Sequence, residues 1–181
     1  MITRFARSIA LIALAALVAC APVPEGRIGP DGLPLPQVYR INERDEQGVY
    51  FRFLDGMNSL RSAVGVAPVQ FSAELNAAAA THSRDMALQN RPWHFGSDGS
   101  SPLDRVERVG YRGEMIGEAI SETYEGELET LAAWVETPET RSVLLDPEAT
   151  EIGIAWYQET AGKLWWTLVT GKEAAMAPLS E

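Results

Sequence analysis

Few residues in this 181-residue chain can carry out chemistry. It holds two histidines, His82 and His94, and a single cysteine, Cys20. One cysteine excludes an intramolecular disulfide and a zinc site built on paired thiolates, and two histidines exclude a three-histidine metal centre. The sequence also contains no Gly-x-Ser-x-Gly elbow, no His-Glu-x-x-His motif and no phosphate-binding glycine loop. These residues therefore give only weak support to catalysis.

The charge of the chain excludes one class of partner. There are 25 acidic residues against 15 lysines and arginines, which gives a formal net charge of −10. Such an excess of acid repels phosphate backbones, so we expect no nucleic acid partner. Hydrophobic residues make up 46% of the chain, which is normal for a globular protein. The composition indicates one acidic domain with additional segments at its ends.

The N-terminal residues have the pattern of an export signal. Arg4 and Arg7 precede an uncharged apolar run, residues 8–19, which ends at Cys20. As a helix this run would rise about 18 Å, too little to cross a bilayer, so it indicates a secretory signal peptide. The sequence Leu-Val-Ala-Cys resembles a bacterial lipobox, which implies that Cys20 is acylated and becomes the first residue of the mature chain. The alternative is an ordinary cleaved signal followed by a chance cysteine.

We therefore predict an exported chain that is lipid-anchored in the bacterial cell envelope through Cys20. Ala21, after the cysteine, is not the acidic residue that such signals use for retention in the inner membrane. This favours the outer membrane if the host has two membranes.

The chain divides into four predicted segments. Residues 1–19 are the lipoprotein signal peptide, and residues 20–48 are a tether rich in proline and glycine that cannot form a core. Residues 49–171 are the folded domain, and residues 172–181 are a tail.

Hydrophobic periodicity predicts the elements of this domain. A first helix over 49–64 places Phe53, Met57, Leu60 and Val64 on one face, and a second runs from an N-cap at Ser72 to about Leu88. The second helix carries His82 on its apolar stripe, so we expect His82 to be a satisfied core histidine.

The remaining elements are shorter. A short helix begins after Ser101, a strand covers about 115–121, and a helix over 128–135 is interrupted at Thr137-Pro138 and then restarts. Alternating apolar residues at 152–156 and 164–168 predict a terminal hairpin, with tryptophans packed in the core. This order indicates an α+β fold, most simply a three-layer α/β/α sandwich.

Residues 58–171 resemble the CAP superfamily (cysteine-rich secretory proteins, antigen 5 and pathogenesis-related class 1 proteins) in its bacterial form, the SCP domain. The resemblance consists of ten short pieces in the family's order: Asn58–Arg61, Leu75–Met86, Trp93–Arg105, Val109–Tyr111, Gly117-Glu118, Ala133-Trp134, Thr137–Arg141, Leu144-Leu145, Ile152–Ile154 and Trp165–Thr167. The family fold is the same sandwich, with a central and mostly antiparallel sheet.

The resemblance also implies a central cavity, which in some members holds zinc between two histidines and one or two glutamates. His94 and Glu118 match one residue of each kind, whereas Thr140, before Arg141, replaces the second histidine, and Ala132 replaces the second glutamate. We therefore predict a degenerate ligand cavity at His94, Glu118, Thr140 and Arg141, with no bound zinc or other cofactor.

Three functions remain open. The first is a non-enzymatic binding module whose groove holds a small apolar or glycan ligand or a protein partner. The second is a hydrolase-like enzyme that uses His94 and Glu118 as base and orienter on an envelope substrate. The third is a structural or adhesion protein that acts through its surface. His94 and Glu118 themselves are interpreted as a structural pair, a polar ligand contact, or a metal or catalytic pair. Accessibility of His94 in a concave pocket distinguishes the first two functions.

Overall fold

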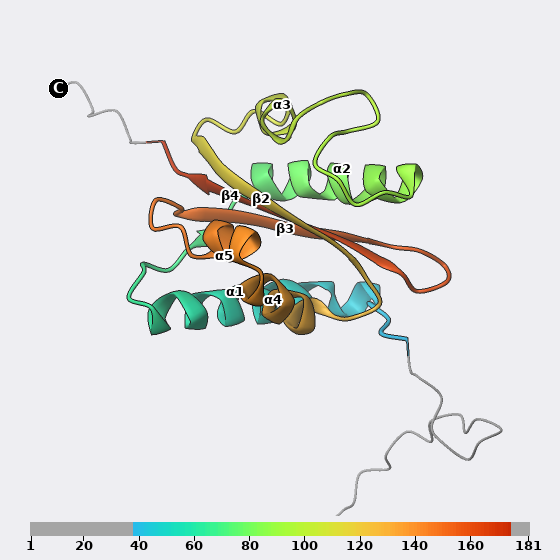
Figure 1. The fold of residues 1–181 in the computed structure, drawn as a ribbon, viewed down its shortest axis with the longest axis horizontal. Coiled ribbons are helices and arrows are strands. Elements are labelled where there is room, and N and C mark those ends of the chain that lie inside the picture. The colour runs from blue at the N-terminus through green and yellow to red at the C-terminus, as the bar shows by residue number, and fades with distance from the viewer. Residues whose placement is uncertain (1–37, 175–181) are drawn as a thin grey trace, which may run out of the picture. The chain divides into compact units, whose positions relative to one another are not determined.

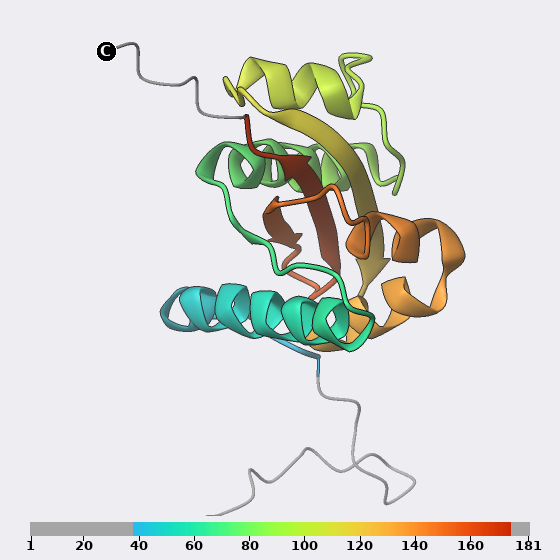
Figure 2. The same cartoon turned by 90° about the vertical axis from the view of Figure 1, so that its left-hand side faces the viewer.

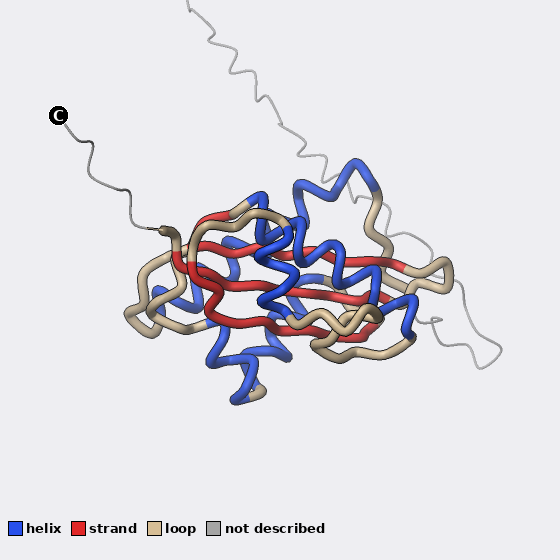
Figure 3. Tube along the Cα trace, turned by 90° about the horizontal axis from the view of Figure 1, so that it is seen from above, coloured by secondary structure: helices blue, strands red, loops and turns tan. Residues whose placement is uncertain are grey.

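A four-stranded mixed sheet forms the centre of the domain. The computed structural model describes residues 38–174. The strands are β1 (Gln70–Phe71), β2 (Glu114–Thr123), β3 (Glu151–Gln158) and β4 (Leu164–Lys172), and they lie in the order β1-β3-β4-β2. The β1–β3 pair is parallel, and the other two pairs are antiparallel. The predicted mostly antiparallel sheet is confirmed, and Figure 3 shows its longer strands side by side.

Helices cover both faces of this sheet. One face carries α1 (Glu46–Ala63), α4 (Glu127–Glu136) and α5 (Pro138–Leu144), and the other carries α2 (Ala73–Gln89) and α3 (Pro102–Arg108) (Figures 1 and 2). A 3₁₀ turn, η1 (Glu43–Asp45), precedes α1. The predicted three-layer α/β/α sandwich is therefore confirmed.

Every residue of β4 except the last is buried, because this strand has a neighbour on each side and helices on both faces. Trp165, Trp166 and Leu168 are completely buried. Trp166 lies 5.3 Å from Trp156 of β3, measured between ring centroids. On the opposite face, α2 approaches β3 so closely that a Cβ atom at Gly153 would collide with the backbone of Leu75. The predicted hairpin and its buried tryptophans are confirmed.

The buried face of α1 differs from the predicted one. Its buried residues are Val49, Phe53, Met57 and Arg61, four apart, while Val64 is 58% exposed. The Arg61 side chain is fully buried and donates hydrogen bonds to the carbonyl oxygens of four residues: Ala67, Leu144, Asp146 and Ala149 (2.7–3.0 Å). A hydrophobic pattern cannot reveal this position, because arginine is buried only when its donors are satisfied.

The folded part begins earlier than the predicted boundary at residue 49. Tyr39 donates a hydrogen bond to Glu127 (2.6 Å), and the backbone N–H of Ile41 donates to Gln158 (3.1 Å). Residues 38–48, predicted as tether, are thus held to the domain by polar contacts that composition does not show, and this boundary is corrected. The predicted signal peptide, Cys20 and the rest of the tether lie outside the described residues, as does most of the tail.

Within residues 38–174, none of the helices combines the length and the apolar character that crossing a bilayer requires.

Replacing Arg61 tests its contribution to stability. Arg61→Met keeps much of the apolar stem but removes every donor to the four carbonyl groups. We expect the free energy of unfolding to fall by about 3 kcal/mol or more, because each unsatisfied buried acceptor costs about 1–3 kcal/mol. Arg84→Met, at an exposed arginine of α2, is the control and should change little. Urea denaturation measures both, and equal effects would contradict this role for Arg61.

Candidate functional site

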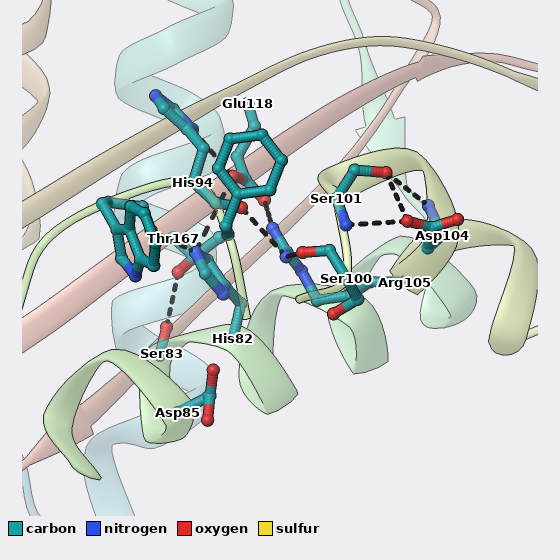
Figure 4. A network of polar contacts seen from close by, with 12 residues as sticks. His82, Ser83, Asp85, His94, Ser100, Ser101, Asp104, Arg105, Glu118 and Thr167 are labelled. Carbon is teal, nitrogen blue, oxygen red and sulfur yellow. Dashed lines mark hydrogen bonds and ion pairs between the residues drawn. The ribbon is translucent and has the colours of Figure 1, made fainter. Parts of the chain in front are cut away.

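The carboxylate of Glu118 is the centre of the polar network shown in Figure 4. Its side chain is only 2% exposed, and each of its two oxygens accepts a hydrogen bond from a different residue. Arg105 Nη2 donates to Oε2 (2.7 Å), and His94 Nδ1 donates to Oε1 (2.9 Å). Both acceptor atoms are therefore engaged within the protein, in charge-assisted contacts that are stronger than neutral hydrogen bonds.

Three elements bring these groups together. Glu118 lies on β2 next to Ala119. Because successive strand residues point to opposite faces, Glu118 faces α2 and α3, whereas Ala119 packs in the hydrophobic core on the α1 side of the sheet. Arg105 lies on α3, whose start is fixed by a capping box between Ser101 and Asp104. Arg105 Nη1 also donates to the backbone oxygens of His94 and Ser100 (3.0 and 3.1 Å). Arg105 thus fastens the 94–100 loop and Glu118 to the same helix.

His94 is oriented by this network but remains at the surface. Its side chain is 51% exposed, although Nδ1 contacts the buried carboxylate. In the neutral ring, a proton on Nδ1 leaves Nε2 without one, so Nε2 is the atom that is free to accept a proton. His94 has the geometry of an oriented imidazole base.

His82 is the buried neighbour of this pair. It is fully buried on α2, donates from Nε2 to the carbonyl oxygen of Trp93 (2.9 Å), and lies 3.8 Å from Glu118 Oε1. Within residues 38–174, its Nδ1 atom has no hydrogen-bond partner. Burial lowers the pKa of His82, and the charge of Glu118 opposes this effect only in part. The predicted burial of His82 is confirmed, whereas the expected satisfaction of its ring is met only at Nε2. Burial holds the ring in its neutral form.

Thr140 and Arg141 do not join His94 and Glu118. Thr140 Oγ1 donates to the backbone oxygen of Trp134 (2.6 Å), and the Arg141 guanidinium donates to the backbone oxygens of Val135 and Glu136. These bonds satisfy carbonyl groups at the end of α4. Those groups have no helical partners, because the helix ends before α5 begins. Among the described residues, no hydrogen bond or ion pair connects either side chain to His94 or Glu118. Of the four predicted cavity residues, the structure joins two.

Arg105 is the residue of this network that the sequence analysis does not single out. It is one of two arginines in a short helix, and only its position in the piece Trp93–Arg105 sets it apart. Its burial, 5% exposed, follows from tertiary contacts that no local pattern encodes.

One cleft of the domain borders this network at Arg105, and a second lies at the opposite edge of the sheet, beside β1. One, of about 270 Å³, lies between α2 and α3 and is lined mainly by polar residues that include Asp85, Asp98, Arg105 and Arg108. The other, of about 440 Å³, is an aromatic groove between α1 and the β1–α2 junction. Its lining residues are Gln47, Tyr50, Phe51, Phe71, Ser72, Ala73 and Asn76. Neither lining includes His94 or Glu118.

The network does not fit the zinc ion that the family resemblance implies. A protein zinc site takes at least three protein ligands. Here Glu118 is bound to Arg105 and His94, Thr140 is engaged with Trp134, and His82 directs its Nε2 proton to a carbonyl group.

Comparison with known proteins identifies the family. The family model described as CAP, cysteine-rich secretory protein family, matches residues 54–170. The chain belongs to the CAP family. The Bacillus subtilis protein YkwD, described as uncharacterized, is 28% identical over 115 residues, which are 64% of this chain and 44% of YkwD. This chain thus matches less than half the length of that relative.

Solved structures of two bacterial proteins show the same fold. An extracellular SCP-domain protein from Bacillus anthracis superposes with a TM-score of 0.66 at 20% identity, over 75% of this chain and 45% of that protein. An outer surface protein from Borrelia burgdorferi gives a TM-score of 0.62 at 14% identity, over 76% and 100% of the two chains. At these identities the likeness supports the fold alone.

The Arg105–Glu118 pair can be tested against an exposed pair on the same helix. Arg105→Met leaves a buried carboxylate without its cation, and we expect a loss of about 3–5 kcal/mol in the free energy of unfolding. Arg108→Met is the matched control, because Arg108 pairs with Asp98 at 2.6 Å where both side chains are more than half exposed. That control should leave stability nearly unchanged in the same urea titration. A similar small effect for both variants would show that the buried pair is not needed.

His82 predicts a loss of stability in acid. Because the folded-state pKa of His82 lies below the ordinary value of 6.5, its contribution is fully present above pH 6.5. As the pH falls below that value, the unfolded chain takes up a proton that the folded chain resists, and stability is lost at up to about 1.4 kcal/mol per pH unit. His82→Gln retains a donor for the Trp93 carbonyl group but cannot titrate. The difference in unfolding free energy between the two proteins should therefore change as the pH falls below 6.5, and a constant difference would refute this role.

Proposed function

We propose that this CAP-domain chain is an exported, lipid-anchored binding module of the bacterial cell envelope, and that its His94–Glu118 pair is structural. The observation that supports this proposal is the occupation of both Glu118 oxygens, by Arg105 and by His94, in a side chain that is 2% exposed. A carboxylate that already accepts two charge-assisted bonds and is shielded from solvent is poorly placed to take up a substrate proton or a metal.

The aromatic groove is the proposed ligand site. Three of its seven lining residues are aromatic, namely Tyr50, Phe51 and Phe71, and Phe51 is 66% exposed although it is a large hydrophobic residue. Its volume of about 440 Å³ lies within the range of small-molecule sites, which is about 300–1,000 Å³. These features favour a small apolar ligand over a glycan or a protein partner.

Export and anchoring are proposed from the N-terminal sequence. The basic residues, the apolar run 8–19 and Cys20 have the order of a lipoprotein signal. The similar Bacillus anthracis protein is described as extracellular, and the similar Borrelia burgdorferi protein as an outer surface protein, which agrees with export of this chain. Several acyl chains on Cys20 would give stable attachment where one chain does not.

The test is to identify what the protein carries from its own envelope. The mature chain is extracted in detergent, and native mass spectrometry followed by solvent extraction identifies any bound small molecule. We expect an apolar molecule on the wild type that Phe51→Asp loses and Val64→Asp retains, because Val64 is similarly exposed but distant from the groove. A bound glycan, or a molecule that Phe51→Asp retains, would contradict the assignment of the groove.

One observation favours a second candidate, a hydrolase-like enzyme. His94 is half exposed and its ring is oriented by a buried carboxylate, as in base–orienter pairs. Hydrolysis of 4-nitrophenyl acetate by the wild type, reduced about 100-fold or more in His94→Gln, would favour this candidate. Equal rates in the two proteins would favour the structural role.

A further inference from the structure

Exposed hydrophobic side chains gather at one end of the domain. We name this end, around the β3–β4 turn (159–163), the turn end. Nine large hydrophobic residues are exposed among residues 38–174, and six of them belong to segments that meet there: Val38, Leu88, Phe95, Tyr124, Leu128 and Tyr157. Leu88 is the most exposed of all nine, at 77%. Scattered exposed hydrophobic residues are normal, but a cluster of them marks a contact surface.

Contacts around the turn show that these segments are neighbours. Arg40 Nη2 donates to the carbonyl oxygen of Thr160 (2.9 Å), which places the first described residues at the turn. Lys163 Nζ donates to Asn90 Oδ1 (2.9 Å), which places the end of α2 there, two residues after Leu88. The pairing of Thr123 with Leu164 brings Tyr124 to the same end. Figure 1 shows the hairpin turn and the start of the described chain on the same side.

The opposite end of the sheet provides a contrast. Arg61, near the end of α1, is hydrogen-bonded to Leu144 and Ala149, just before β3 begins. Val64, three residues after Arg61, therefore lies at the end of the sheet that is remote from the turn. Val64 is 58% exposed, so it is an exposed hydrophobic residue comparable with Leu88 but outside the turn end.

The side chains of the turn end are of the kinds found at membrane–water interfaces. After Leu88, the 90–96 loop holds Trp93 and Phe95 with their ring centroids 5.7 Å apart, and the Arg91 guanidinium lies 3.8 Å from the Trp93 ring. Aromatic rings and arginines are suited to the headgroup region, where an apolar body and a polar tip are both satisfied. Lys163 also pairs with Glu122 and Glu159, so its one positive charge partly offsets two carboxylates at this end.

The lipid anchor, as proposed above, would place a bilayer close to this surface. Residues 21–37 separate Cys20 from Val38, and a chain of that length spans at most about 60 Å. The chain joins the domain at the turn end, so the anchor and the exposed hydrophobic residues share one end of the domain. Tethering makes the contact intramolecular and raises its effective concentration to the millimolar range, so even a weak surface affinity suffices.

We propose that the turn end rests on the surface of the membrane to which the chain is anchored, with Leu88 and the Trp93–Phe95 loop at the level of the lipid headgroups. This proposal rests on the lipid anchor of the proposed function. It gives the domain a fixed orientation, in which the end that carries Val64 faces away from the bilayer.

Single fluorescent labels test this orientation in the full, lipid-modified chain. The thiol of Cys20 is blocked when acylated, so Leu88→Cys and the matched control Val64→Cys each offer one reactive thiol. Both proteins are labelled with a nitrobenzoxadiazole dye and reconstituted into vesicles of phosphatidylethanolamine and phosphatidylglycerol. We expect a blue shift, an increase in emission of about twofold or more, and quenching by brominated lipid for the label at 88 but not at 64.

Flotation of the same vesicles separates the possible failures. Protein that floats while both labels report water would overturn the orientation and leave the anchor intact. Protein that does not float would overturn the anchor and the orientation with it. A blue shift at 88 that is insensitive to brominated lipid and appears only at high protein density would identify a second protein copy as the occupant, and would also overturn the proposal.

Discussion

Burial of the Glu118 carboxylate is the constraint on which the layer formed by α2 and α3 depends. A carboxylate on the covered face of a sheet is strongly disfavoured unless it is paired and hydrogen-bonded. Arg105 supplies the charge, and the same guanidinium binds the backbone of the 94–100 loop. The position of α3, the course of the loop and the orientation of His94 therefore follow from one pair.

A second buried arginine has the corresponding role on the other face. Arg61 has no carboxylate partner among its hydrogen bonds, and its donors are matched instead to four carbonyl groups in two connecting segments. The segments before β1 and before β3 are thereby held together, which fixes the point where the short parallel strand joins the sheet. Each layer of helices is thus joined to its loops by the hydrogen bonds of one buried guanidinium. Lysine could not replace either arginine, because it lacks the rigid, multidentate donor geometry.

The sequence predicts the helices and strands better than it predicts the hydrogen bonds of these two buried arginines. Period and capping residues identify α2, α3 and the hairpin, because burial of a helix face and satisfaction of its first N–H groups are local requirements. The resemblance to the CAP family, which the family model supports, predicts His94 and Glu118 as partners. Neither the hydrophobic period nor the family resemblance predicts the burial of Arg61 and Arg105. Their burial depends on carbonyl groups and a carboxylate supplied by distant segments. Thr140 and Arg141 are the converse case. The family resemblance predicts that they line the cavity, but their side chains are hydrogen-bonded locally at the end of α4.

The position of β4 has a consequence for how the protein is made. This strand is the last regular element of the described chain, yet it lies between β3 and β2 and pairs with both. During synthesis from the N terminus, β2 and β3 have no partner in common until residues 164–172 have emerged, so the sheet cannot close early. Long-range pairings of this kind delay folding. A chain that stays open until its final strand is available is well suited to being threaded through a translocation channel before it folds.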